Sequence, residues 1–167
     1  MSYIDTSVII LALDPTDPRS VKAREELEKE GNKIVSELVL TELSAVLSRK
    51  DHILKELRRL LDVENEEVLV KATILYVLKR FNLVYRSTGS ATGILLGVGE
   101  VYKPMLIAMN TSIYTRLKAL DLLHLAYVKS LIDSGERINH IVTGDADFKK
   151  VEDWLTKNYN VKVKLIT

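Results

Sequence analysis

The chain has 167 residues, of which 47% are apolar and 28% are charged, so it can form one domain with a sizeable hydrophobic core. Its net charge of +1 provides no overall positive field for nucleic acid, and any contact with a polyanion requires a local basic patch. The absence of cysteine excludes disulfides, zinc–thiolate sites and thiol nucleophiles. The sequence has no secretory leader and no apolar run near the ~20 residues of a membrane span, so we expect a cytoplasmic protein.

Short apolar segments that are typical of buried strands alternate with longer helical segments along the chain. We expect Ser20 and Ser36 to cap the helices that follow them, and residues 8–13 to form a helix or a loop. The remaining segments predict strands at residues 3–4, 33–35, 83–85, 140–142 and 161–166, and helices at residues 20–30, 37–49, 51–61, 65–81, 104–116, 120–132 and 147–157.

One segment is unlike the rest because it holds four of the seven glycines between residues 87 and 99. It fits a flexible loop, a hairpin or a contact surface for another subunit. No repeat and no linker divides the chain. We therefore expect a single domain over residues 1–167, with a glycine-rich insertion around residues 87–104.

The alternation of strands and helices predicts an α/β fold with a parallel sheet covered on both faces. In such sheets, binding residues gather outside the carboxyl ends of the strands. Asp5 and Asp145 both follow predicted strands, whereas Glu42 and Asp121 lie in the first turns of predicted helices. We expect these four acids to lie at one edge of the sheet.

The same four acids each stand in an apolar motif that contains no lysine or arginine. A carboxylate in apolar surroundings is unfavourable to bury unless a partner offsets its charge. A bound cation is one such partner, and oxygen ligands without thiolates suit Mg²⁺ or Mn²⁺. The pattern thus indicates a metal site and phosphodiester chemistry.

Each of these acids also has a structural alternative. Asp5 fits a turn residue, Glu42 a solvated helix face, and Asp121 a helix N-cap. Asp145 and Asp147 both fit turn or capping residues as well as metal ligands. His124, one turn after Asp121, is more typical of a packed helix histidine than of a residue that tunes a pocket.

Four motifs, in this order, resemble those of the PIN-domain family of metal-dependent ribonucleases, particularly the toxins of VapBC-type toxin–antitoxin modules. They are Ile4-Asp5-Thr6-Ser7, residues 36–43 (SELVLTEL), residues 120–126 (LDLLHLA) and residues 142–148 (VTGDADF). The resemblance implies a three-layer α/β/α sandwich with a mainly parallel central sheet of about five strands. The segment from about residue 87 to 104 departs from it, because it is longer and richer in glycine than the connection usual in these toxins.

The resemblance also implies roles for particular residues. It gives Mg²⁺ or Mn²⁺ as the cofactor, bound by Asp5, Glu42, Asp121 and Asp145, with Asp147 as a further ligand. It also implies that the hydroxyls of Ser7 and Thr143 form hydrogen bonds to these carboxylates and orient them.

The expected function is that of a ribonuclease that hydrolyses phosphodiester bonds as the toxin of a toxin–antitoxin pair. An RNA-processing nuclease without an antitoxin and a non-catalytic PIN-like scaffold stay open as alternatives. The expected partners are RNA, a cognate antitoxin and a second copy of the chain, with residues 75–78 as a candidate dimer surface. The residues expected to meet RNA phosphates are Arg49, Lys50, Arg58, Arg59, Lys149 and Lys150.

Overall fold

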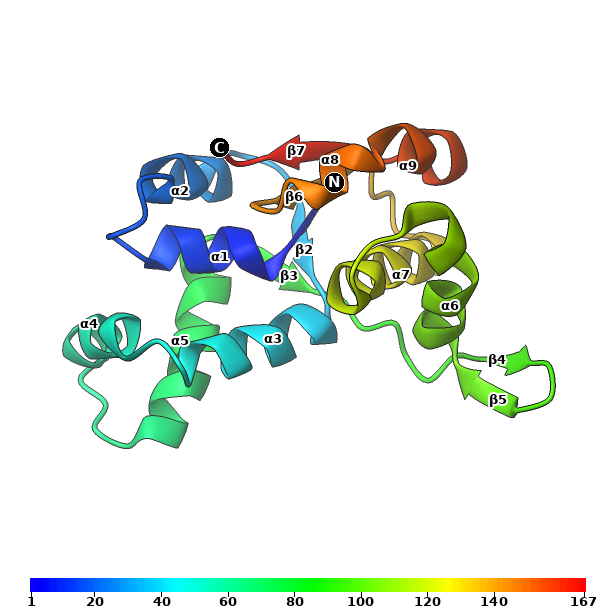
Figure 1. Ribbon diagram of the computed structural model, residues 1–167. Coiled ribbons are helices and arrows are strands. Elements are labelled where there is room, and N and C mark those ends of the chain that lie inside the picture. Colours follow the sequence, from blue (N-terminus) through cyan, green and yellow to red (C-terminus); the bar gives the residue numbers. More distant parts are fainter.

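The computed structural model describes residues 1–167 and has a five-stranded parallel sheet at its centre (Figure 1). The strand order is β3-β2-β1-β6-β7, so that Tyr3 of the central strand pairs with Ile34 on one side and Ile141 on the other. The strands are β1 (Ser2–Ile4), β2 (Lys33–Val35), β3 (Leu83–Tyr85), β6 (His140–Thr143) and β7 (Lys162–Leu165). This sheet confirms the predicted fold class.

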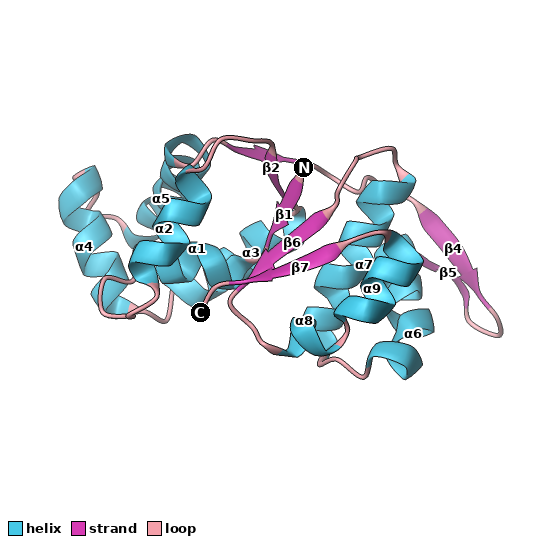
Figure 2. Cartoon of the chain, turned by 90° about the horizontal axis from the view of Figure 1, so that it is seen from above, coloured by secondary structure: helices cyan, strands magenta, loops and turns pink.

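Helices cover the sheet on both sides (Figure 2). One side carries α1 (Thr6–Leu13), α2 (Ser20–Glu28), α3 (Glu37–Leu47), α4 (Asp51–Leu61) and α5 (Glu66–Arg80). The other carries α6 (Lys103–Thr115), α7 (Ala119–Asp133), α8 (Asp147–Lys150) and α9 (Glu152–Tyr159). None of these helices combines the length and the apolar composition needed to cross a membrane. Because both faces are covered, β2 is buried along its whole length and the central strand is buried at Tyr3 and Ile4.

Three local predictions need correction or refinement. Ser20 is the first residue of α2 and not its cap; the cap is Arg19, whose N–H donates to Asp17. Ser36 does precede α3, but its side chain makes no capping bond and instead lies 2.9 Å from the Tyr3 hydroxyl. The predicted helix at residues 147–157 is two helices, α8 and α9, which are separated at Val151.

The glycine-rich segment forms a hairpin, which is one of the three predicted possibilities. Strands β4 (Thr92–Leu95) and β5 (Gly99–Tyr102) pair antiparallel and extend away from the main body beyond α6 (Figure 1). Its tip residue Leu96 is 95% exposed. At its base, Thr88 and Tyr102 both donate hydrogen bonds to the Glu37 carboxylate, which ties the hairpin to the start of α3.

Asp14, at the end of α1, is buried and joins this helix to the start of α4. Its Oδ2 lies 3.1 Å from Lys50 Nζ and 3.0 Å from His52 Nε2. Its Oδ1 accepts hydrogen bonds from the backbone N–H and the hydroxyl of Thr16. All these groups stabilise the ionised carboxylate.

Replacing Asp14 with asparagine is expected to lower the free energy of unfolding at pH 7 by about 1–3 kcal/mol. Burial raises the pKa of this carboxyl, but hydrogen bonds from Thr16, His52 and Lys50 outweigh burial and hold the pKa well below its ordinary value. In the unfolded chain an aspartate binds its proton near about pH 4, so the stabilisation is present at neutral pH and shrinks below that value. Urea unfolding of both proteins at pH 7 and pH 3 measures the difference. An equal difference at the two pH values would contradict this account.

Candidate metal centre

Four acids from distant parts of the chain line one cavity of about 240 Å³. Asp5 follows the central strand β1, Asp145 follows the neighbouring strand β6, Glu42 lies on α3 and Asp121 lies in the first turn of α7. The cavity therefore opens at the carboxyl edge of the sheet, where parallel strands place the residues that follow them. The other lining residues are Thr6, Ser7, Ile10, Val46 and His124.

Asp5 is held by hydroxyl groups on one of its two carboxylate oxygens. Its Oδ2 accepts hydrogen bonds from Ser7 Oγ at 2.6 Å and from Thr143 Oγ1 at 2.5 Å. Ser7 Oγ accepts in turn from the Gly144 N–H at 2.8 Å, and Thr143 Oγ1 accepts from the Asp145 N–H at 3.0 Å. These bonds fix the orientation of the carboxylate.

Gly144 stands where the β6–α8 connection passes close to the side chains of α1. A Cβ atom at this position would lie 2.8 Å from Leu11 Cδ1 and 3.4 Å from Ser7 Oγ. A larger residue would therefore have to displace the end of the Leu11 side chain or shift the connection that carries Thr143 and Asp145.

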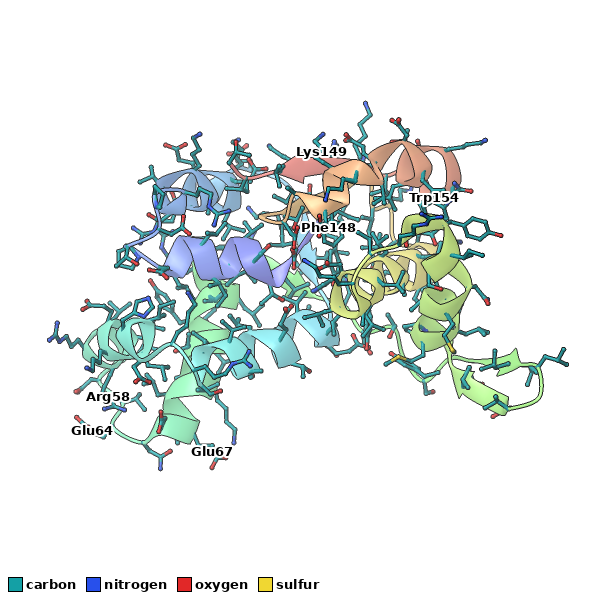
Figure 3. All side chains as sticks on the ribbon, in the orientation of Figure 1. Arg58, Glu64, Glu67, Phe148, Lys149 and Trp154 are labelled. Atoms are coloured by element: carbon teal, nitrogen blue, oxygen red, sulfur yellow. The ribbon has the colours of Figure 1, made fainter.

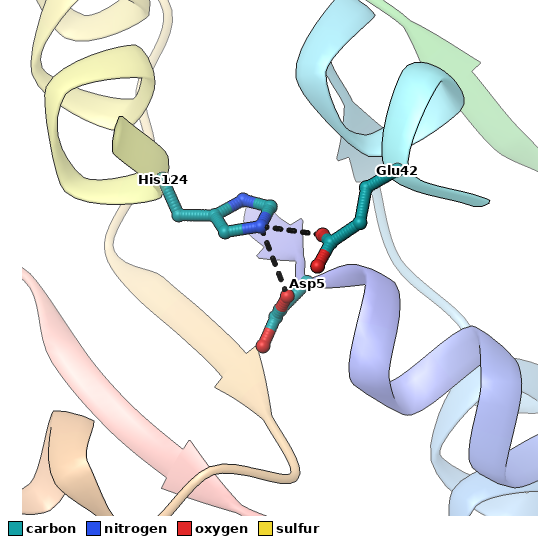
Figure 4. A group of neighbouring side chains, drawn as sticks. All are labelled: Asp5, Glu42 and His124. Carbon is teal, nitrogen blue, oxygen red and sulfur yellow. Dashed lines mark hydrogen bonds and ion pairs between the residues drawn. The ribbon is translucent and has the colours of Figure 1, made fainter. Parts of the chain in front are cut away.

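His124 reaches the cavity from α7 and contacts two of the acids (Figure 4). Its Nε2 atom lies 2.9 Å from Glu42 Oε2 and 3.3 Å from Asp5 Oδ1. Burial lowers the pKa of this imidazole, but the negative charges of Asp5 and Glu42 outweigh burial, and the net shift is upward. For Glu42 the two effects have the opposite signs: burial raises the pKa of the carboxyl, but the hydrogen bond from His124 brings this pKa below its ordinary value. The histidine is packed, as predicted, since it is only 1% exposed, and it also contacts the pocket.

Asp121 is the acid whose charge is least compensated. Its Oδ2 atom is buried and has no hydrogen-bond partner. Burial, together with the negative charges of Asp145 and Asp5, raises the pKa of this carboxyl to about 6. A buried carboxylate oxygen without a donor is unfavourable, and a cation in the cavity would satisfy it.

Asp147 differs from these four acids because it does not line the cavity. Its oxygens lie 3.2 Å from Lys118 Nζ and 2.5 Å from Lys150 Nζ, and these lysines lower the pKa of the carboxyl. One of its oxygens is nevertheless within 4.8 Å of oxygens from Asp121 and Asp145. Lys118, which sequence reasoning missed, stands directly before α7, and its position beside Asp147 depends on the packing of that helix.

The basic residues expected to meet RNA do not form a single patch. Lys150 is paired with Asp147, Lys149 with Glu152 and Lys50 with Asp14. Arg58 lies on α4, well away from Lys149 (Figure 3). In sequence, Arg49 and Lys50 lie shortly after the cavity-lining Val46, and Lys149 and Lys150 lie shortly after the cavity-lining Asp145.

A family model described as the PIN domain matches residues 2–153. The chain belongs to the PIN-domain family. No protein of curated function matches the sequence significantly.

Solved structures share the fold at low sequence identity. VapBC2 from Rickettsia felis, bound to a DNA fragment from the promoter, aligns with a TM-score of 0.57 at 14% identity over 100% of both chains. VapC20 from Mycobacterium tuberculosis, a toxin that cleaves the sarcin–ricin loop, gives 0.53 at 14% identity over 90% of this chain and 95% of its own. VapBC-1 from nontypeable Haemophilus influenzae aligns with a TM-score of 0.51 at 16% identity, over 99% of this chain and 98% of its own. The whole chain thus corresponds to the fold of these toxins.

Proposed function

We propose that the protein is a ribonuclease that depends on Mg²⁺ or Mn²⁺ and acts as the toxin of a toxin–antitoxin pair. The observation that carries this proposal is the convergence of Asp5, Glu42, Asp121 and Asp145 on one cavity. Membership of the PIN-domain family and the shared fold with VapC toxins support the same assignment.

The residues present fit a hard divalent cation. The cavity offers four carboxylates, one imidazole and no thiolate, and carboxylate oxygens are the donors that Mg²⁺ and Mn²⁺ prefer. The unpartnered Oδ2 of Asp121 supplies a second, independent sign of a missing positive charge. The positive charges of His124 and Lys118 offset the charge of Asp121 only in part, because the pKa of its carboxyl stays raised, and both Lys118 and Lys150 are paired with Asp147.

In the proposed site, Asp5 and Asp145 hold the principal ion, and Glu42 and Asp121 complete the ligand set directly or through water. When bound, the cation supplies the charge that activates a water molecule and neutralises phosphoryl oxygens. Ser7 and Thr143 keep Asp5 in one orientation through their bonds to Oδ2. Asp147 remains a predicted further ligand at the edge of the site. If its carboxylate bound the cation, Lys118 and Lys150 would lose their ion pairs with it and could contact an RNA phosphate.

The proposed partners follow from the same comparison. Two of the similar structures are VapBC complexes, so we propose a cognate antitoxin for this chain. RNA is the proposed substrate; the similar VapC20 toxin cleaves the sarcin–ricin loop. A homodimer through residues 75–78 is also proposed; Leu75 is 60% exposed there, whereas Val77 is buried.

The proposal is tested by incubating the purified protein with a mixed-sequence RNA in buffer containing Mn²⁺, Mg²⁺ or EDTA. We expect cleavage with either ion and none with EDTA. Cleavage that persists in EDTA contradicts a metal-dependent nuclease. Binding of Mn²⁺ without cleavage of any RNA favours the scaffold alternative.

The affinity for Mn²⁺ is expected to rise about tenfold between pH 5 and pH 7. A carboxyl must lose its proton to bind a cation, and the pKa of Asp121 is about 6, so that its ionised fraction grows over this interval. Isothermal titration calorimetry with Mn²⁺ at several pH values measures the affinity. An affinity that stays constant from pH 5 to pH 7 would contradict a role for Asp121 in ion binding.

A further inference from the structure

A line of buried hydrogen-bonding side chains connects the centre of the sheet to the acidic cavity. Ser36 Oγ lies 2.9 Å from the Tyr3 hydroxyl, and the same hydroxyl lies 2.9 Å from His124 Nδ1. The other ring nitrogen of His124 faces Glu42 and Asp5 (Figure 4). Ser36 and Tyr3 are 0% exposed and His124 is 1% exposed, so the line is shielded from solvent.

The partners of the ring determine where its hydrogen atoms lie. Ionised carboxylates only accept hydrogen bonds, so Nε2, which lies between Glu42 and Asp5, must carry a hydrogen. Tyr3 is the partner of Nδ1, and its ring also packs edge-on against the imidazole at a centroid distance of 5.9 Å. A ring turned by 180° would lose both the Tyr3 bond and the bond to Glu42. The Tyr3 contact therefore fixes the orientation of the imidazole.

We propose that Tyr3 and Ser36 are positioning residues, which hold His124 so that its Nε2–H keeps the Glu42 and Asp5 carboxylates together in the cavity. His124 is then a hydrogen-bond donor and not a ligand of the cation. The assignment of the cation rests on the proposed function, whereas the hydrogen-bonding line stands on the geometry alone. A donor that spans two like charges arranges them before the cation binds, and loss of such partners typically weakens metal binding 10–100-fold.

The first test compares His124→Gln with His124→Asn, since neither side chain titrates. The Gln amide nitrogen can occupy the place of Nε2, whereas the shorter Asn reaches only the place of Nδ1. We expect His124→Gln to bind Mn²⁺ within about threefold of the wild type and His124→Asn to bind at least about tenfold more weakly. Equal affinities of the two variants would overturn the proposal.

The second test uses Tyr3→Phe, which removes a single hydroxyl and keeps the ring. We expect Mn²⁺ affinity to fall several-fold while the far-UV circular dichroism spectrum stays unchanged. Unchanged affinity in a folded Tyr3→Phe protein would overturn the positioning role. This variant decides the question if the His124 variants do not fold.

The third test observes the ring directly by long-range ¹H–¹⁵N NMR of the wild type, without metal and with saturating Mg²⁺. We expect Nε2 to carry its hydrogen in both states. An Nε2 atom that lacks the hydrogen, in either state, would overturn the proposal and make His124 a candidate ligand. A wild type that binds no Mn²⁺ contradicts the proposed function, while the metal-free spectrum still decides the hydrogen-bonding line.

Discussion

Replacing Asp5 with asparagine is expected to reduce metal-dependent RNA cleavage by at least about two orders of magnitude while the fold is retained. The side chain lies at the exit of the central strand, where it lines the cavity shared by the four acids. Asparagine keeps an oxygen that can accept the bonds from Ser7 and Thr143, so the local structure has a replacement partner. What it loses is the negative charge that a cation requires, and the second oxygen, which faces His124 Nε2.

The matched control is Asp62→Asn, because Asp62 is exposed and lies at the end of α4 in the left-handed conformation that asparagine tolerates. Cleavage rates with Mn²⁺ and melting temperatures are measured for the wild type and both variants. We expect the control to cleave at the wild-type rate and both variants to melt within a few degrees of it. Full activity of the Asp5→Asn variant would contradict a role for Asp5 in binding the ion.

Replacing Asp121 with asparagine is expected to have two opposite effects: loss of Mn²⁺ binding and cleavage, and a more stable metal-free protein at pH 8. Burial and the charges of Asp145 and Asp5 raise the pKa of this carboxyl to about 6. Below about pH 4 it is protonated in both the folded and the unfolded chain. As the pH rises through 6, the folded protein must ionise it unfavourably, so folding stability is lost.

The neutral amide avoids this loss. We expect Asp121→Asn to raise the free energy of unfolding by about 1–2 kcal/mol at pH 8, less than the full pKa shift implies because the cavity is partly open to solvent. This corresponds to a rise in melting temperature of about 3–6 °C, and to no rise at pH 4.

The control is Asp153→Asn, which removes an exposed aspartate from the first turn of α9, as the test variant removes one from the first turn of α7. Both substitutions remove the interaction of the carboxylate with the helix dipole, so a stability gain seen only for Asp121 belongs to the acidic cavity. Melting curves in EDTA at pH 4 and pH 8 measure it. A gain in melting temperature of equal size at pH 4 and pH 8 would contradict the explanation by repulsion between like charges in the cavity.

The sheet and the place of two acids follow from local sequence features. Short strands with two or three apolar residues each, separated by helical segments, already predict a parallel sheet. Asp5 and Asp145 come one and two residues after the end of such a strand, and the two strands prove to be neighbours, β1 and β6. Glu42 and Asp121 are placed at the same edge by their positions in the first turns of predicted helices, and the family resemblance agrees, but their distance from the other two acids depends on how α3 and α7 pack.

Other features depend on contacts that local sequence does not encode. The bond between Tyr3 and His124 joins residues 121 positions apart, and the bond between His124 and Glu42 joins residues 82 apart. The one available signal was the position of His124 one turn after Asp121, which places both on the same side of α7. The Ser36 side chain was predicted to cap α3, but the Tyr3 hydroxyl competes for it.

The central claim, that the four acids form one ion site, is tested most directly by a crystal structure of the protein with Mn²⁺, using anomalous scattering to locate the ion. We expect an anomalous peak in the cavity, within about 2.0–2.3 Å of carboxylate oxygens of Asp5 and Asp145, with Glu42 and Asp121 bound directly or through water. An empty cavity at saturating Mn²⁺, or a peak only at other acids, would contradict the claim.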